Sequence, residues 1–292
     1  MSVASLGSII GSPPPIGGGD ALPWPEGTPD TPRPLFGSHI SFSQLSTFQT
    51  CPERYRQRYL LGRRARRGAA LIVGTAAHKA AAWNDEQKID TGLDLPVDDV
   101  LSACAGAFDQ AVSDDAEAGG VEWGDTKPGA AKDQAVALSR AYHEQAAASV
   151  QAVSVEQRIL IAIPTVTVPL LGYVDIVCSD RIVERKFVAR AVAKPEWLLQ
   201  GAIYSAALGG LPVEWHVTSK TKTPTVKRDL VAWDPTPAHH VRVLERVAMT
   251  VRRIEDAYER YGADEAWDGD GVTHDWACSY CGHRSDCPWW KR

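Results

Sequence analysis

The sequence predicts an α/β (α+β) protein in which a helical region precedes a sheet. Residues 39–150 contain successive helical stretches, whereas residues 154–188 are rich in β-branched side chains and are expected to form three strands. A helix, further strand sequence and a long amphipathic helix over residues 237–261 complete the pattern. Helices that come first and strands that come later are typical of one core with a helical N-terminal region.

The composition indicates a globular protein that is large enough for a hydrophobic core. The chain has 292 residues, of which 44% are apolar and 23% are charged. It contains no apolar run of bilayer-spanning length and no signal-peptide pattern, so we expect a cytoplasmic protein without a membrane partner. Residues 1–38 are rich in Gly, Pro and Ser and are expected to be a disordered tail. A single domain over 39–292 follows, with a helical part (39–150), a sheet core (151–235) and a C-terminal part (236–292).

Local signals place the individual elements. Ser43 is expected to cap a helix through Phe48, and Pro52 is expected to open a helix that ends near Leu60. Further helices are predicted over 74–89, 97–117, 128–150 and 195–208, and strands over 154–163, 166–178, 181–188, 213–219 and 225–233.

Two carboxylates and a lysine are predicted to meet on one hairpin. If Ser179 and Asp180 form a two-residue turn, Asp175 lies opposite Glu184 in the antiparallel pair. Lys186 follows Glu184 by two residues and therefore projects from the same face of its strand. Opposed carboxylates repel each other unless a cation lies between them, so we expect a Mg²⁺ or Mn²⁺ site with an ammonium group beside it. This grouping suits phosphodiester hydrolysis, and the alternative is a surface hairpin of alternating charge.

Three further side chains are candidates for the same site. His78 lies in an alanine-rich helix, where a neutral imidazole could complete the metal shell. Gln200 and Tyr204 are four residues apart on one helical face and could bond a phosphate or the attacking water. The structural alternatives are a packed core histidine and an ordinary amphipathic helix.

Four cysteines form a split set. Cys278, Cys281 and Cys287 lie close together near the C-terminus, and Cys51 lies far earlier in the chain. Cys51 and Cys287 each precede a proline, which is a context found at iron–sulfur ligands. Four thiolates could hold either Zn²⁺ or a [4Fe–4S] cluster, and either would act as a clasp between the N-terminal and C-terminal parts. The remaining two cysteines are expected to be packed thiols.

Taken in order, these motifs resemble the RecB-like branch of the PD-(D/E)XK nucleases, especially the iron–sulfur exonucleases related to the CRISPR-associated RecB-like exonuclease. The resemblance covers most of residues 39–292 and depends on the one-plus-three cysteine set and on four short motifs. The motifs are Gly74-Thr-Ala-Ala-His78, Gly172-Tyr-Val-Asp175, Glu184-Arg-Lys186 and Gln200-Gly-Ala-Ile-Tyr204.

The resemblance implies a restriction-endonuclease-like core that cleaves DNA with Mg²⁺ or Mn²⁺, often as an exonuclease on single strands or ends. The residues that it implies at the catalytic centre are His78, Asp175, Glu184, the carbonyl of Arg185, Lys186, Gln200 and Tyr204. The first four would be metal ligands, the lysine would be catalytic, and the last two would lie near the substrate. The four clustered cysteines would hold a [4Fe–4S] cluster.

The resemblance also suggests a role for a local concentration of positive charge. Residues 51–67 contain seven arginines and one glutamate, although the whole chain has a net charge of −5. These arginines could guide a single strand toward the metal through phosphate contacts, or could form a solvated surface. The candidates are Arg54, Arg58, Arg63 and Arg64. The acidic segment 84–126 has no assigned role.

The sequence departs from the family pattern at two positions. Glu184 stands where the family often has aspartate, which preserves the chemistry, and Phe187 stands where threonine usually follows the lysine. The chain lacks an ATP-binding phosphate loop, so a helicase would have to be a partner; an annealing protein or a CRISPR adaptation protein is another candidate partner. Two alternatives stay open, a non-catalytic DNA-binding or scaffold subunit with a structural cluster, and a four-cysteine zinc protein unrelated to nucleases.

Overall fold

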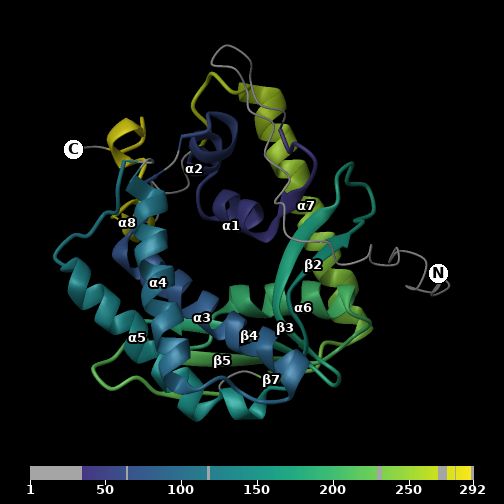
Figure 1. The fold of residues 1–292 in the computed structure, drawn as a ribbon. Coiled ribbons are helices and arrows are strands. Elements are labelled where there is room, and N and C mark those ends of the chain that lie inside the picture. Colours follow the sequence, from purple (N-terminus) through teal and green to yellow (C-terminus); the bar gives the residue numbers. More distant parts are fainter. Residues whose placement is uncertain are drawn as a thin grey trace. The chain divides into compact units, whose positions relative to one another are not determined.

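The computed structural model describes residues 35–63, 65–116, 119–228, 232–268, 275–279 and 281–290. They form two compact units (Figure 1). The first unit contains the described residues up to 65, residues 159–172 and those after 237, and the second unit contains the rest. The predicted tail over 1–34 and the candidate Arg64 lie outside the described residues. No helix in the described ranges combines the length and the apolar character that a bilayer crossing needs.

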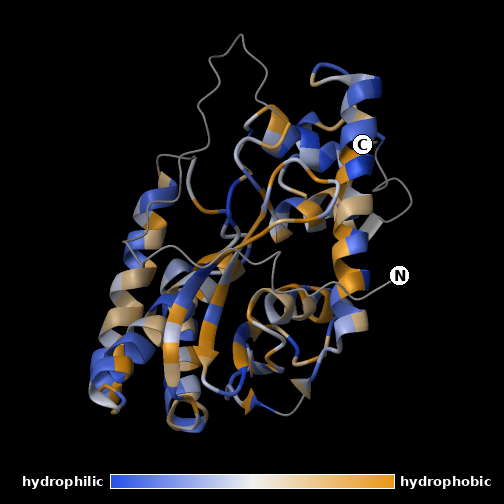
Figure 2. Cartoon of the chain, turned by 90° about the vertical axis from the view of Figure 1, so that its right-hand side faces the viewer, coloured by the Kyte–Doolittle hydropathy of each residue, from blue (hydrophilic) through white to orange (hydrophobic). Residues whose placement is uncertain are grey.

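The second unit has a mixed sheet that contains the predicted hairpin. β3 (Leu170–Cys178) is antiparallel to β4 (Ile182–Val188), and β4 is parallel to β5 (Val213–Ser219). Two short strands, β6 (Val226–Lys227) and β7 (Ala232–Trp233), pair with β5 in antiparallel fashion. Apolar residues are frequent along the strands of this sheet (Figure 2), because both faces of the strands are buried. β2 (Ala152–Ile161) pairs with β3.

Helices cover both faces of the sheet of the second unit. α3 (Ala69–Thr91), α4 (Val97–Ala116) and α5 (Pro128–Gln145) pack together on one face, and their common core includes Phe187 of β4 (Figure 1). α3 contributes mainly buried alanines to this core, so the helix lies close to its neighbours. α6 (Pro195–Ala207) packs on the opposite face, where Gly201 lies directly against the ring of Trp215 on β5.

The first unit joins segments from both ends of the sequence. It contains α1 (Phe42–Thr50), α2 (Pro52–Tyr55), a π-helical turn over Arg56–Leu60, α7 (Pro237–Tyr261) and α8 (Asp275–Ser279). β1 (Ile40–Ser41) pairs in parallel with the start of β3. Pro52 opens α2 as predicted.

Several predicted boundaries are wrong for identifiable reasons. Ser41, not Ser43, caps α1, because its hydroxyl accepts from the N–H of Gln44 while the Gln44 side chain returns to the Ser41 N–H. β3 begins at Leu170 rather than at 166, because the backbone bends at Thr167 and Val168. The strand predicted over 225–233 is two short strands, and the helix predicted through residue 150 ends at Gln145.

The contact between α6 and β5 generates a stability prediction. A Cβ added at Gly201 would lie 2.6 Å from the Trp215 ring, so Gly201→Ala should lower the free energy of unfolding by roughly 1–3 kcal/mol. Gly106 on α4 has open space around it, and Gly106→Ala should raise that free energy by roughly 0.5–1 kcal/mol. Urea unfolding of the two variants measures both effects. Equal changes in the two variants would contradict the close packing of α6.

Candidate active site

The hairpin between β3 and β4 has the predicted turn and register. The N–H of Cys178 donates to the carbonyl of Arg181 over 2.8 Å, which closes a two-residue turn. Ile176 pairs with Val183 further along the ladder. Because side chains alternate along a strand, this register directs Asp175 and Glu184 toward each other.

Where the backbone ladder of the hairpin ends, the carboxylates of Asp175 and Glu184 accept hydrogen bonds from backbone N–H groups in place of backbone carbonyls. The N–H of Asp175 donates to Glu184 Oε1 over 3.2 Å. The N–H of Arg185 donates to Asp175 Oδ2 over 2.8 Å. Each carboxylate is therefore held by the backbone of the opposite strand, and Glu184 is only 1% exposed. The structure thus brings the predicted acidic pair together.

A hydrogen-bonded chain of side chains extends from Glu184 to α6. Lys186 Nζ lies 3.1 Å from Glu184 Oε2 and 3.0 Å from Gln200 Oε1, to which it donates. Gln200 Nε2 in turn donates to the hydroxyl oxygen of Tyr204 over 2.9 Å. The predicted i,i+4 pair on α6 therefore bonds within itself and to the lysine. Its contact with Lys186 indicates that Gln200 orients the ammonium group.

His78 approaches the acidic pair from α3 on the other face of the sheet. His78 Nδ1 lies 3.7 Å from Asp175 Oδ2. Its ring meets the edge of Phe187, with ring centroids 5.0 Å apart. Phe187, one of the two departures from the family pattern, therefore supports the imidazole. Burial, only partly opposed by the Asp175 charge, lowers the pKa of His78 to about 4, so the ring is neutral at neutral pH.

Mutual repulsion separates the protonation behaviour of the two carboxyls. Burial and the Asp175 charge raise the pKa of Glu184 to about 7. Burial also disfavours the Asp175 carboxylate, but His78, Arg185 and Lys186 outweigh it and lower the pKa of Asp175. Burial alone would lower the pKa of Lys186, yet Glu184 and Asp175 raise it above its ordinary value. At neutral pH Asp175 is therefore ionised and Lys186 is protonated, whereas Glu184 titrates near neutrality.

The donor set fits a hard divalent cation. Two carboxylates and a neutral imidazole are ligands that Mg²⁺ and Mn²⁺ accept. The pKa of Glu184 near neutrality indicates a carboxyl that a cation would readily deprotonate. Across the parts of the chain that the structure describes, no three His, Cys, Asp or Glu side chains are placed so that they could hold a metal ion together.

Comparison with known proteins identifies the family. The sequence profile of the PD-(D/E)XK nuclease superfamily matches residues 39–288. The chain belongs to this superfamily. A crystal structure described as a "Putative exonuclease" from Eubacterium rectale is similar, with 17% sequence identity, 75% of this chain and 80% of that chain covered, and a TM-score of 0.49. No curated protein matches the chain. The predicted superfamily is confirmed, and the iron–sulfur branch stays a prediction.

Two groups near the nuclease site were not predicted from the sequence. Asp85 of α3 forms a fully buried ion pair with Arg185, with Oδ2 and Nη1 2.7 Å apart. A usable signal existed, because Asp85 follows His78 by seven residues and so shares its helix face. Glu156 of β2 is the second group. It has a left-handed φ of 48°, and burial and the negative charge of Asp175 raise its pKa.

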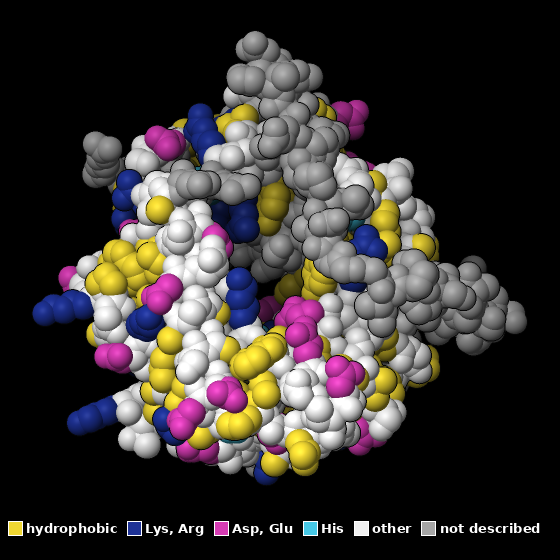
Figure 3. Space-filling model, in the orientation of Figure 1, with side chains coloured by type: hydrophobic (Ala, Val, Ile, Leu, Met, Phe, Trp, Pro, Cys, Tyr) yellow, Lys and Arg dark blue, Asp and Glu magenta, His cyan; other side chains and the backbone are white. Residues whose placement is uncertain are grey.

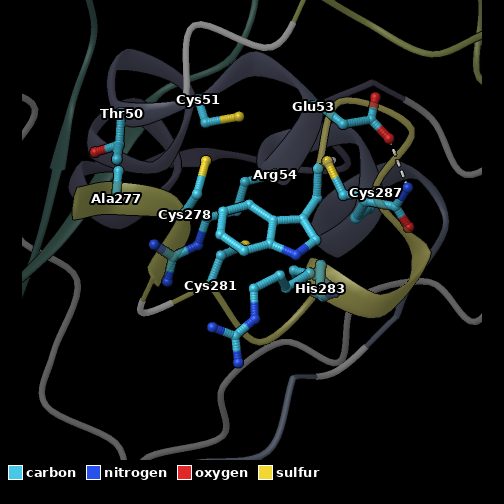
Figure 4. Close-up of a pocket in the computed structure, with 12 residues that line it drawn as sticks. Thr50, Cys51, Glu53, Arg54, Ala277, Cys278, Cys281, His283 and Cys287 are labelled. Carbon is cyan, nitrogen blue, oxygen red and sulfur yellow. Dashed lines mark hydrogen bonds between the residues drawn. The ribbon is translucent and has the colours of Figure 1, made fainter. Parts of the chain in front are cut away.

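The four cysteines of the split set line a single pocket in the first unit (Figure 4). Cys51 precedes α2, and Cys278, Cys281 and Cys287 come from the C-terminal segment. All four are free thiols. Figure 4 shows the sulfur atoms of Cys51, Cys278 and Cys287 directed into the space between the residues. The four thiols therefore share one pocket, but among the described residues they are not placed so that three of them could hold a metal ion.

Protein contacts alone already join the chain ends of the first unit. Glu53 is buried and accepts from Arg56 Nη2 over 2.8 Å and from the N–H of Trp267 over 2.8 Å. Arg56 also donates to the carbonyl of Ala263 over 2.7 Å. The Trp267 ring stacks on Tyr55 with centroids 5.8 Å apart. Sequence reasoning missed the role of Glu53 in joining the chain ends, because its partner Trp267 lies 214 residues away.

The structure divides the arginine-rich segment into structural and available residues. Arg56 is buried against Glu53 and serves the fold. Arg58 and Arg63 are exposed, and Arg54 lines the cysteine pocket. Burial, together with the positive charges of these three arginines, lowers the pKa of His283. On the face shown in Figure 3, basic and acidic side chains are intermixed, so any phosphate-binding region is local.

The raised pKa of Glu184 predicts a pH-dependent stability of the metal-free protein. The Glu184 carboxyl binds its proton more tightly in the folded state than in the unfolded state. This difference stabilises the fold fully at pH below about 4.5, and the stabilisation is lost as pH rises through about 7. Relative to the wild type, Glu184→Gln should therefore gain roughly 3 kcal/mol of unfolding free energy between pH 4.5 and pH 8. Urea unfolding in EDTA across this range measures the difference. Parallel curves for the two proteins would contradict the buried acidic pair.

Proposed function

We propose that the protein is a Mg²⁺- or Mn²⁺-dependent deoxyribonuclease that hydrolyses phosphodiester bonds as an exonuclease, at single-stranded DNA or DNA ends. The observation that carries the proposal is the continuous arrangement of Asp175, Glu184, Lys186 and Gln200, with His78 beside it. The superfamily membership supports nuclease chemistry. Recombination, repair and the processing of viral or CRISPR DNA are the processes that such an enzyme would serve.

In this proposal each side chain has a distinct task. His78, Asp175, Glu184 and the carbonyl of Arg185 would hold the cation, which when bound polarises the phosphate and lowers the pKa of water. Lys186 stays protonated, so it donates to the attacking water or to a phosphate oxygen rather than accepting a proton.

The α6 pair positions this lysine and limits its motion. Gln200 accepts from Lys186 and is itself fixed by Tyr204, so the ammonium group is directed toward the acidic pair before substrate arrives. Preorganised donors of this kind stabilise charge that develops in the transition state without reorganisation. Gln200 and Tyr204 therefore serve catalysis mainly through Lys186.

Substitution at the acidic pair and at the lysine tests the proposed activity. Asp175→Ala and Lys186→Ala should each reduce DNA cleavage by at least about 100-fold, because each removes a charged group from the reacting centre. Both variants should stay folded by circular dichroism. The measurement uses 5′- and 3′-labelled single-stranded and duplex DNA with Mn²⁺ or with EDTA.

Matched controls come from exposed residues of the same elements. Asp180→Ala in the hairpin turn and Lys194→Ala before α6 should cleave like the wild type, since both side chains are exposed. Retained cleavage in the Asp175 or Lys186 variant would refute the assignment. A wild-type protein that binds DNA but never cuts would favour the scaffold alternative.

We also propose that Cys51, Cys278, Cys281 and Cys287 hold a [4Fe–4S] cluster, with Zn²⁺ as the alternative occupant. The support is their common pocket and the cationic lining that Arg54 provides against the charge of four thiolates. A bound centre would reinforce the contacts between Glu53 and Trp267 that already join the chain ends.

Metal content and colour separate the two occupants. Anaerobically purified protein should be brown and contain about four irons per chain. Cys287→Ser should lose iron and unfold at lower temperature, whereas Cys104→Ser, which changes a buried thiol outside the pocket, should keep the iron. Colourless protein with one Zn²⁺ would contradict the iron–sulfur assignment, and metal-free protein would contradict both occupants.

Arg54, Arg58 and Arg63 are proposed to bind the phosphates of the DNA strand. In support, Arg58 and Arg63 are exposed and Arg54 lines the cysteine pocket, whereas Arg56 is buried in an ion pair with Glu53. These three arginines, which lie within residues 54–63, concentrate positive charge on a chain whose net charge is −5.

The salt dependence of binding tests the arginines. Changing Arg54, Arg58 and Arg63 together to Gln should reduce the slope of log affinity against log salt by about 2 for single-stranded DNA, because about 0.7 is lost per phosphate contact. Fluorescence anisotropy in EDTA measures this without cleavage. The exposed Arg242 on α7 supplies the control, and Arg242→Gln should leave the slope unchanged. A triple variant with the wild-type slope would exclude these arginines.

A further inference from the structure

We propose that the buried ion pair between Asp85 and Arg185 is a positioning device that sets where His78 stands relative to the catalytic carboxylates. The inference rests on the proposed function, because that function makes His78 a metal ligand. Asp85 bonds to Arg185, so it would act on the site through that residue and through α3. It is therefore a positioning residue.

Arg185 connects two parts of the second unit through its two ends. Its guanidinium Nη1 donates to Asp85 Oδ2 over 2.7 Å, and both side chains are 0% exposed. Its backbone N–H donates to Asp175 Oδ2 over 2.8 Å. The same Asp175 oxygen lies 3.7 Å from His78 Nδ1. Asp85 is thus connected to His78 in two ways, through contacts with Arg185 and Asp175 and along the backbone of α3.

The geometry of α3 explains why the single contact at Asp85 is enough to position His78. Asp85 follows His78 by seven residues, which is two helical turns on one face and about 10 Å along the axis. A lock at Asp85 therefore determines the translation and rotation of the helix at His78.

The surface of α3 between His78 and Asp85 does little by itself to fix the position of the helix against the sheet. The buried side chains of α3 between them include Ala80, Ala81 and Ala82, which are small and interlock weakly with a sheet. In some proteins a directional buried polar contact specifies one arrangement among several similar ones, as a buried asparagine does in coiled coils.

The ion pair is poorly suited to a purely stabilising role. A buried pair of this kind is often no more stable than apolar residues of similar volume. The guanidinium is also incompletely bonded, because Arg185 Nε and Nη2 are buried without a hydrogen-bond partner among the described residues. It lies over the ring of Tyr142, 5.8 Å from the centroid, in surroundings that an apolar side chain could fill. Position, rather than stability, is what the pair supplies.

A charge-balanced double variant tests the inference. Asp85→Leu combined with Arg185→Met removes the pair without changing the net charge near the site, and apolar replacement should keep the protein folded. We expect an unfolding temperature near that of the wild type. We expect Mn²⁺ binding to weaken roughly 10- to 100-fold, as when the support of a metal ligand is lost. Electron paramagnetic resonance of free Mn²⁺, without DNA, measures the affinity independently of cleavage.

A thermodynamic cycle with His78 identifies the route of the effect. In a His78→Ala background the same double change should alter Mn²⁺ affinity by less than about twofold, because the residue that it positions is gone. Asp85→Asn, which keeps the side-chain shape, should weaken Mn²⁺ binding in the same direction and serves if the double variant does not fold.

The control lies on the same helix. Buried Lys88 forms an ion pair with the partly exposed Asp94 at 3.0 Å, and Lys88→Met combined with Asp94→Leu should leave Mn²⁺ affinity unchanged. Wild-type affinity in the Asp85 and Arg185 variants, or an equal loss in the His78→Ala background, would overturn the positioning role. A wild-type protein that binds no Mn²⁺ would overturn the proposed function and this inference with it.

Discussion

The register of β3 against β4 is the constraint on which the proposed catalytic centre depends. With Ile176 opposite Val183, the next residues along are the two carboxylates, and each bonds to the backbone of the other strand. A shift of one residue would turn Glu184 and Lys186 to the α3 face and Arg185 to the α6 face, because side chains alternate along a strand. Buried apolar neighbours on both strands oppose that shift, since it would expose them or bury charge. The chemistry is therefore held in place by ordinary hydrophobic packing.

The site is assembled from opposite faces of the sheet and is electrostatically costly. Gln200 on α6 accepts a hydrogen bond from Lys186, and His78 on α3 lies beside Asp175. Burial, followed by repulsion from Asp175, raises the pKa of Glu184 to about 7, and attraction to the two carboxylates raises the pKa of Lys186. A bound cation would relieve this repulsion. The same features that would make the centre bind metal make the metal-free protein less stable above neutrality.

Much of the site could be predicted from local sequence, and the remainder depends on contacts between distant segments. Turn length and strand alternation are enough to oppose Asp175 and Glu184, and helical periodicity is enough to pair Gln200 with Tyr204. Neither rule connects Asp85 with Arg185, which are one hundred residues apart. Competing local bonds explain other errors, such as the cap of α1, where Ser41 and Ser43 are equally good by type and only Gln44 decides between them. Composition likewise could not distinguish buried Arg56 from exposed Arg58.

The central claim is that Asp175, Glu184 and His78 form a divalent-metal centre. Anomalous diffraction from crystals of the protein soaked in Mn²⁺ tests it most directly, because the signal locates the ion without reference to activity. The account predicts a manganese peak bonded to both carboxylates and the imidazole, and its absence from crystals of the Asp175→Ala protein. Well-ordered carboxylates with no manganese between them, or a peak only at other residues, would contradict the account.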